Sequence, residues 1–131
     1  MYLLDTNTCI FLKNKKPLHV LEKLKSVITE RLFISSITVG ELQFGVYNSQ
    51  NIDQNRISLT EFLAPFDILD FDDNDAEIFG KIRTDLKRKG LLIGPYDMLI
   101  GAQALTKRLT LVTNNTEEFK RIPGLKIEDW K

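Results

Sequence analysis

The chain alternates short apolar runs with longer segments in which apolar residues recur at helical spacing. The apolar runs predict strands at residues 2–4, 32–35, 66–71, 109–113 and 125–127. Only the run at 66–71 alternates apolar and acidic residues, as a strand near a sheet edge would. Because helices separate the strands and most strands are fully apolar, we expect an α/β fold with a parallel central sheet of about four to five strands and helices on both faces.

The segments between these runs predict helices whose ends carry capping residues. Asp72, Asp73 and Asn74 precede the longest helical pattern, and Gly90 follows it, as expected for a capped start and a left-handed stop. Residues 13–17 and 48–55 are polar and predict a basic turn and a connection. The expected helices run from Thr6 or Asn7 through Leu12, across Val20 to Ile28, from Ser36 or Thr38 to Val46, from Ile57 to Leu63, from residue 74 to 89, and from Pro95 to Thr106, with a short one before the last strand.

The totals limit the possible classes without choosing a function. A length of 131 residues predicts one domain, spanning 1–131, that can bury a core. Eighteen basic residues balance eighteen acidic ones, so net charge argues neither for nor against a nucleic-acid partner. The single Cys9 excludes an internal disulfide and fits a reducing cytoplasm, and no stretch reaches the roughly 18 apolar residues of a membrane helix.

Four acidic residues lie where one predicted element gives way to another: Asp5, Glu41, Asp97 and Glu118. In open parallel sheets, ligands bind outside the carboxyl ends of the strands. Asp5 and Glu118 follow strands closely, and we expect Glu41 and Asp97 in the first turns of helices that face the same crevice. Carboxylates gathered beside a core repel one another and lose solvation, so a hard divalent cation such as Mg²⁺ or Mn²⁺ is the expected partner. The leading hypothesis is metal-assisted phosphodiester chemistry.

Each acid also has a purely structural interpretation. Asp5 can simply cap the first helix, and Glu41 can be a first-turn acidic residue that the helix dipole stabilises. Glu118 and its neighbour Glu117 can both be solvated surface residues. Asp97 is hardest to explain in this way, because it interrupts a helix whose other residues are apolar.

A spacing detail accompanies two of the acids. Glycine follows four residues after Glu41 and four residues after Asp97, at Gly45 and Gly101. A small residue on the face of the carboxylate admits a substrate, or it allows tight helix packing.

Basic residues form four short clusters along the chain, at 13–16, 87–89, 107–108 and 120–121. A basic rim around an acidic centre would suit a phosphate backbone, although solvated helix faces explain most such clusters equally well. His19 and Cys9 cannot build a zinc site of the usual kind, so proton transfer would fall to carboxylates and metal-bound water.

The motifs around the four acids resemble a known family. Leu-Leu-Asp-Thr-Asn at 3–7, Ser-Ser-Ile-Thr-Val-Gly-Glu-Leu at 35–42, Ile-Gly-Pro-Tyr-Asp at 93–97 and Leu-Val-Thr-Asn-Asn-Thr-Glu-Glu-Phe at 111–119 are similar to PIN-domain ribonucleases. More narrowly, the chain resembles VapC toxins of bacterial VapBC toxin–antitoxin modules, including the closing Leu-Lys-Ile-Glu-Asp-Trp at 125–130. The order and spacing of the motifs carry the resemblance, since each motif alone is weak.

The resemblance implies a PIN fold and a Mg²⁺- or Mn²⁺-dependent endoribonuclease that cuts initiator tRNA in its anticodon stem-loop and so stops translation. It also implies a VapB-type antitoxin partner and a homodimer. The catalytic and metal-binding acids of the family correspond to Asp5, Glu41 and Asp97, with Glu118 as the fourth, and Thr6 and Asn115 as supporting residues. Many relatives carry aspartate near the fourth place, where this chain offers Asn114, Asn115, Glu117 and Glu118.

Three other classes compete with this hypothesis. A receiver domain would need an acidic pair after the first strand, where Asp5 stands alone. A phosphatase of the Asp-x-Asp-x-Thr type fails because position 7 is Asn and position 9 is Cys. A PIN-fold protein that binds RNA or a partner without cutting is the remaining alternative, and metal-dependent cleavage by purified protein would discriminate it.

Overall fold

Five parallel strands form one sheet in the order β3-β2-β1-β4-β5 in a computed structural model that describes all 131 residues. This arrangement confirms the expected parallel sheet with helices on both faces, and β3 lies at an edge as its alternating pattern predicted. The strands are β1 (Tyr2–Leu4), β2 (Leu32–Ser35), β3 (Asp67–Leu69), β4 (Thr110–Val112) and β5 (Ile127–Glu128).

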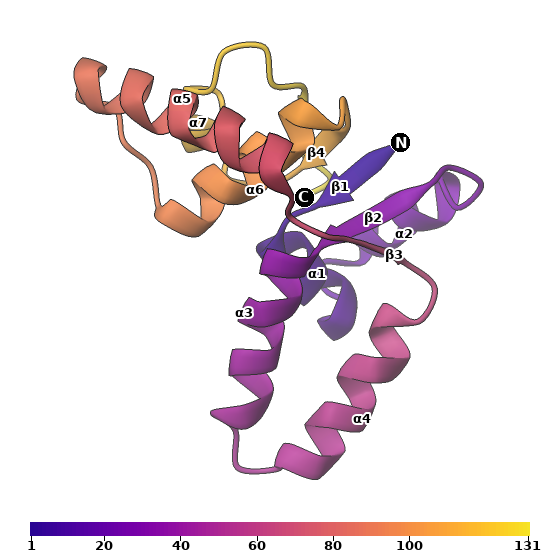
Figure 1. Ribbon diagram of the computed structural model, residues 1–131. Helices are drawn as coiled ribbons and strands as arrows, with labels where there is room; N and C mark the ends of the chain where they lie inside the picture. Colours follow the sequence, from indigo (N-terminus) through magenta and orange to yellow (C-terminus); the bar gives the residue numbers. More distant parts are fainter.

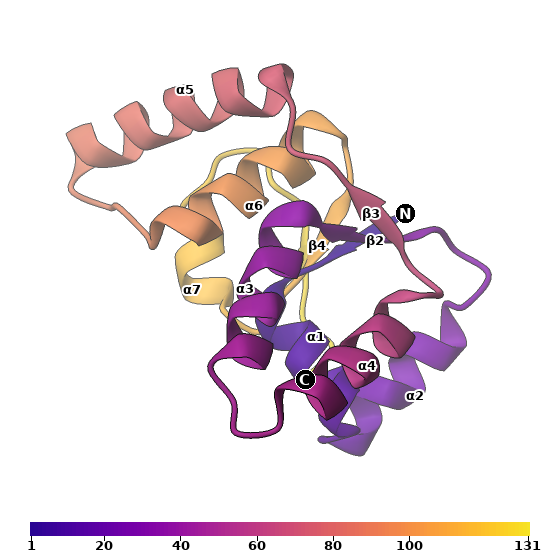
Figure 2. The ribbon, with the colours of Figure 1, turned by 60° about the horizontal axis from the view of Figure 1, so that its bottom comes forward.

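Seven helices cover the sheet, and none is long and apolar enough to cross a membrane. Helices α5 and α6 pack against each other on one side of the sheet, while α1 and α2 lie on the other (Figures 1 and 2). Helices α3 and α4 pack side by side as an arm that extends away from the sheet (Figure 1). Their bounds are α1 (Thr6–Asn14), α2 (Leu18–Ser26), α3 (Ser36–Tyr47), α4 (Ile52–Leu63), α5 (Asp73–Lys89), α6 (Pro95–Thr106) and α7 (Thr116–Phe119).

Alternating side chains on the three central strands feed two separate hydrophobic cores. Leu3 and Leu111 belong to the core beneath α5, α6 and α7, whereas Leu4 and Val112 belong to the core beneath α1 to α4. Successive side chains of a strand point to opposite faces, so a sheet covered on both faces needs apolar residues at every position. This requirement explains why these strands are continuous apolar runs.

The longest helix has the ends that the sequence predicted. Asp72 is the N-cap of α5 and forms a capping box with Asp75, and Gly90 ends the helix in the left-handed conformation with φ 69°. Asp75 is fully buried, and Lys107 lies 3.4 Å from its carboxylate. The capping box and this ion pair therefore fix the start of α5 against the end of α6.

Three details of the predicted elements were wrong. Helix α4 begins at Ile52, inside the segment 48–55 that we expected to be a connection. The prediction failed because the first turn of this helix is polar and shows no apolar periodicity. Helix α2 ends at Ser26, so Ile28 lies beyond the helix in which we expected it, and it is exposed. The first helix is capped by Asp5, not by Thr6 or Asn7, and it extends through Lys13 to Asn14.

The closing Glu-Asp-Trp segment has a structural role. Trp130 is buried, packs edge-on against Tyr2 with ring centroids 5.5 Å apart, and donates a hydrogen bond to Glu128. These contacts hold the end of the chain against β1.

Candidate functional site

Asp5 lies directly after β1 and is almost completely buried, with 3% of its surface exposed. Its Oδ1 accepts a hydrogen bond of 2.8 Å from the backbone N–H of Thr8, so it does cap α1. Burial raises the pKa of Asp5 above its usual value, while the hydroxyl of Thr113 and the contacts with Thr8 oppose that rise. The charge of Glu41 raises the same pKa further, so capping does not account for all of its surroundings.

Glu41 is the sixth residue of α3 and lies in its second turn, which corrects the first-turn position that we expected. Stabilisation by the helix dipole therefore explains Glu41 less well, since the effect of the dipole falls off within the first turn. Thr6 donates a hydrogen bond of 2.7 Å to Glu41 Oε1, and the Thr38 hydroxyl lies 3.1 Å from Thr6 Oγ1. Because Thr6 has one hydroxyl proton, Thr38 can donate to Thr6 while Thr6 donates to Glu41.

Asp97 is the third residue of α6, two positions after the Pro95 that begins this helix. Its pKa rises from 3.8 to about 6, first through burial and then through the charges of Asp5, Glu41 and Glu118. A charge effect of this kind needs proximity, so Asp5, Glu41 and Glu118 all lie near Asp97. The four acids come from the end of β1 and from α3, α6 and α7.

The fourth acid is now distinguishable from its neighbour. Glu118 accepts a hydrogen bond of 2.9 Å from the Asn115 side chain, which also lowers the pKa of Asp97. Glu117 is exposed and pairs with Lys120 at 2.9 Å. Glu118 and Asn115 therefore face the acidic cluster, and Glu117 faces solvent.

Two hydroxyl residues near the acids were not among the site residues proposed from the sequence, although Thr113 lies in the 113–116 turn that could orient a metal-bound water or simply cap the last helix. Thr113 is fully buried beside Asp5 and accepts a hydrogen bond of 2.9 Å from the backbone N–H of Asn115. Thr38 is fully buried next to Thr6. A signal existed for Thr113, which directly follows β4 and so lies at the same edge as Asp5, but nothing in the sequence marked Thr38.

The two glycines four residues after an acid have different roles. A Cβ at Gly101 would lie 2.6 Å from Ile122 Cδ1, so this glycine serves tight packing. A Cβ at Gly45 would meet no atom within 4 Å, and Gly45 lines an open groove together with Glu41. Only Gly45 therefore fits the interpretation that a small residue leaves room for a ligand.

The donors of the cluster fit a hard divalent cation, because Mg²⁺ and Mn²⁺ prefer oxygen ligands and all four acids supply carboxylates. As the side chains stand, no three acidic, histidine or cysteine residues are close enough to hold an ion together. Glu41 is turned toward Thr6 and Glu118 toward Asn115. The repulsion that raises the pKa of Asp97 is nevertheless the kind that a bound cation would relieve.

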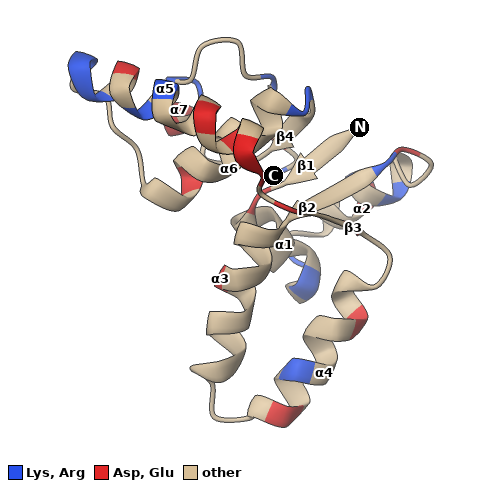
Figure 3. Cartoon of the chain, viewed as in Figure 1, with Lys and Arg blue, Asp and Glu red and all other residues tan.

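Lysine and arginine residues are spread over several separate helices and loops (Figure 3). The group at 87–89 occupies the far end of α5, and Lys107 and Lys120 pair with acids near them. Lys13, near the end of α1, differs because it lines the groove that contains Glu41. Of the basic clusters predicted to surround the acids, only Lys13 is placed by the structure in a groove with one of the four acids, so the rim stays a prediction.

Comparisons with known proteins agree with this geometry. The model of the PIN domain matches residues 2–125. The chain is 44% identical over 129 residues to the tRNA(fMet)-specific endonuclease VapC of Salmonella typhimurium, covering 98% of this chain and 97% of the relative. It is 43% identical over 131 residues to ribonuclease VapC2 of Rickettsia felis, covering 99% and 98%.

Solved structures give the same result. The crystal structure of VapBC2 from Rickettsia felis bound to a promoter DNA fragment matches with a TM-score of 0.93 at 42% identity, covering 99% of this chain and 98% of that one. DNA-bound VapBC from Salmonella typhimurium also matches with a TM-score of 0.93, at 43% identity and the same coverage. Sequence, fold and the convergence of four acids thus agree: the chain belongs to the PIN-domain family and, within it, to the VapC ribonucleases.

Proposed function

We propose that this protein is a metal-dependent endoribonuclease, the toxin of a VapBC-type toxin–antitoxin pair, and that it cuts initiator tRNA in the anticodon stem-loop. The observation that carries the proposal is the convergence of Asp5, Glu41, Glu118 and Asp97, in which three charges help to raise the pKa of the fourth carboxyl to about 6. Bacterial relatives of the same length, named as VapC ribonucleases, support the choice of RNA as substrate.

The four acids would hold Mg²⁺ or Mn²⁺, with Asp5 and Asp97 as the principal ligands and Glu41 and Glu118 completing the set. Such an ion would supply a bound water of lowered pKa and charge neutralisation at the scissile phosphate. Thr6 fixes the direction of Glu41 by its hydrogen bond, and Asn115 does the same for Glu118. The hydrogen bond from the backbone N–H of Thr8 orients the buried carboxylate of Asp5.

The partners are proposed by likeness to relatives. Two structural neighbours are VapBC complexes bound to DNA, and we propose that this chain likewise binds a VapB-type antitoxin that blocks the acidic site. We further propose that residues 1–131 act as one domain, because both cores pack on one sheet, and that the protein forms a homodimer in the cytoplasm.

Cleavage of bacterial RNA by antitoxin-free protein tests this proposal. Total RNA is incubated with Mg²⁺, with Mn²⁺ or with EDTA, and the cut ends are mapped. Asp97→Asn serves as the inactive variant, and Glu117→Gln serves as a matched control because Glu117 is an exposed acid close to the site. We expect a discrete metal-dependent cut in initiator tRNA that is lost in Asp97→Asn and kept in Glu117→Gln.

Other outcomes separate the parts of the proposal. A discrete metal-dependent cut in a different RNA would retain the chemistry and reject the target. Full activity of Asp97→Asn would reject the role of the acidic cluster. Absence of any cut by folded protein would favour a PIN-fold protein that binds RNA or a partner without cleaving it.

A further inference from the structure

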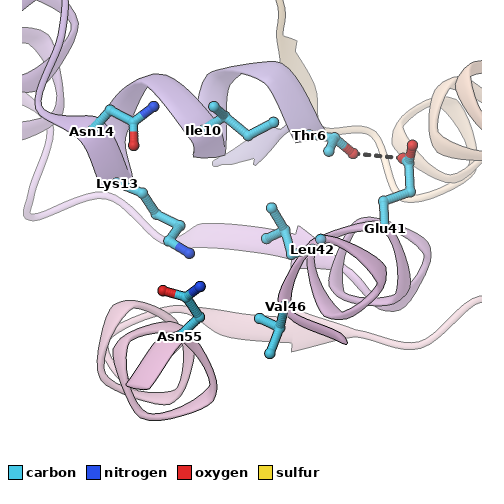
Figure 4. A pocket seen from close by; sticks show the side chains of 9 residues that line it. Thr6, Ile10, Lys13, Asn14, Glu41, Leu42, Val46 and Asn55 are labelled. Carbon is cyan, nitrogen blue, oxygen red and sulfur yellow. Dashed lines mark hydrogen bonds between the residues drawn. The ribbon is translucent and has the colours of Figure 1, made fainter. Parts of the chain in front are cut away.

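A groove beside the acidic cluster carries one basic side chain that the proposed chemistry does not use. The groove lies between α1, α3 and α4, and has a volume of about 290 Å³, close to the lower end of small-ligand pockets. Thr6 and Glu41 lie at one end of it, and Lys13, Asn14 and Asn55 lie at the other (Figure 4). The groove therefore leads directly from the proposed cutting site.

Lys13 is the only charged side chain besides Glu41 in this groove. Five other lysines pair with carboxylates: Lys23, Lys81, Lys89, Lys107 and Lys120. Lys13 makes no such pair, although it is half-buried, and its ammonium points across the groove toward Asn55 (Figure 4). A partly desolvated ammonium without a counter-ion gains from an incoming anion.

The groups around Lys13 suit a phosphate more than another ligand. Asn14 and Asn55 supply neutral amides, and Asn55 uses one amide hydrogen on Ser49, which leaves the other available. The floor at Gly45 is open, since nothing lies within 4 Å of where its Cβ would be. A polyanion that approaches four carboxylates needs a nearby cation, and backbone phosphates are the usual target of such lysines.

We infer that Lys13, with the amides of Asn14 and Asn55, binds a backbone phosphate of the RNA chain next to the one that is cut. The inference rests on the proposed ribonuclease function and adds to it a binding site outside the acidic cluster. Lys13 would position the RNA along the groove, so that the scissile phosphate reaches the acids and the neighbouring phosphate is neutralised.

The test measures RNA binding without cleavage. An initiator tRNA anticodon stem-loop is titrated with the Asp97→Asn protein in Mg²⁺, alone and combined with Lys13→Gln, Lys13→Arg or Lys25→Gln. Lys25 is an exposed helical lysine with no ion pair and lies outside the groove, which makes it the matched control. We expect Lys13→Gln to weaken Kd about tenfold at low salt and to reduce the slope of log K against log salt by about 0.7 to 0.9. Lys13→Arg keeps most of the affinity, and Lys25→Gln changes little.

A second arm identifies the group that Lys13 contacts. Single phosphates of the stem-loop are replaced in turn by neutral methylphosphonates. One replacement near the cut position should weaken RNA binding by the protein that keeps Lys13. The same replacement should not change the Kd of Lys13→Gln, which is the result that a double-mutant cycle gives for two groups in direct contact. Thermal melting of Lys13→Gln at the same temperature as its parent shows that the fold is retained.

Several results would overturn the inference. Equal Kd and salt slope for Lys13→Gln and Lys25→Gln would do so, as would methylphosphonate effects that do not depend on Lys13. Loss of antitoxin binding with intact RNA binding in Lys13→Gln would assign the groove to a protein partner. If wild-type protein cuts RNA and the cycle shows no coupling, the inference fails and the proposed function stands; if coupling appears without any cleavage, the reverse holds.

Discussion

Removing the charge of Asp97 should abolish cleavage and, without metal, make the protein more stable. Moving a carboxyl pKa from 3.8 to about 6 disfavours its charged form by about 3 kcal/mol, since one pKa unit corresponds to about 1.4 kcal/mol. Asp97 is only half-buried, so solvent screening reduces this to about 1.5 kcal/mol. We therefore expect Asp97→Asn to melt about 5 °C above wild type in EDTA at pH 7.5.

The pH dependence of this difference has a definite sign. The folded-state pKa of Asp97 is raised, so the folded protein holds more protons than the unfolded chain between about pH 4 and pH 6. The stability of wild type relative to Asp97→Asn therefore falls as pH rises through that window, and the two proteins converge below pH 4. Groups that do not interact with Asp97 affect both proteins alike and cancel in the comparison, whereas Asp5, Glu41 and Glu118 are coupled to Asp97 and sharpen or broaden the transition.

Thermal and urea unfolding between pH 4 and pH 8 measure this difference, with and without Mn²⁺. Added Mn²⁺ should raise the Tm of wild type much more than that of Asp97→Asn, because an ion that binds only the folded state stabilises it by mass action. Glu117→Gln is the control and should melt and unfold very close to wild type at every pH, since its ion pair with Lys120 is exposed. An Asp97→Asn protein that is no more stable than wild type in EDTA, or whose advantage does not change with pH, would refute the reasoning.

Three further predictions concern the residues around the acids. Thr6→Val removes the hydrogen bond to Glu41 and should lower the cleavage rate about tenfold with little change in Tm, as single-turnover kinetics can measure. Gly101→Ala should destabilise the protein by about 1–3 kcal/mol in urea because its Cβ would meet Ile122 at 2.6 Å, whereas Gly45→Ala should be neutral or stabilising by up to about 1 kcal/mol. Lys107→Met leaves the buried Asp75 without its cation and should lower the free energy of unfolding by about 3 kcal/mol, so equal stability would show that Asp75 is satisfied otherwise.

The fold was predictable because a sheet buried on both faces requires strands that are apolar at successive positions. Strands such as Tyr2–Leu4 are continuous apolar runs for this reason. Asp72 and Gly90 bound α5 because few residues meet the backbone requirements of a helix start and a left-handed helix end. The start of α4 was not predictable, because its first turn is polar and Asn51 makes no side-chain cap. The end of α2 was predicted too late, because Ile28 continues the apolar spacing of this helix although the helix ends at Ser26.

The acids of the candidate site were predictable from position, and their supporting residues were not. Asp5 and Glu118 follow strands whose carboxyl ends must share one edge of a parallel sheet. Thr38 contributes through a contact with Thr6, 32 residues away in the chain, which no local pattern can reveal. The same limit applies to Lys13. The sequence predicted a basic turn at residues 13–17, whereas in the structure Lys13 belongs to α1 and lines the groove that contains Glu41.

The hydrogen bonds of the site explain how the fold keeps four acids together despite their repulsion. Asp5 is held by the backbone of Thr8, Glu41 by Thr6 and Glu118 by Asn115, each bond being 2.7–2.9 Å long. Each of these three carboxylates therefore has a hydrogen-bond partner of its own, and as they stand no three acids are close enough to hold one ion together. Asp97 takes up a proton more readily, because burial first and then the charges of the other three acids raise its pKa to about 6. Cation binding would therefore require Glu41 and Glu118 to turn from Thr6 and Asn115 toward the ion, and relief of the repulsion around Asp97 would favour that change.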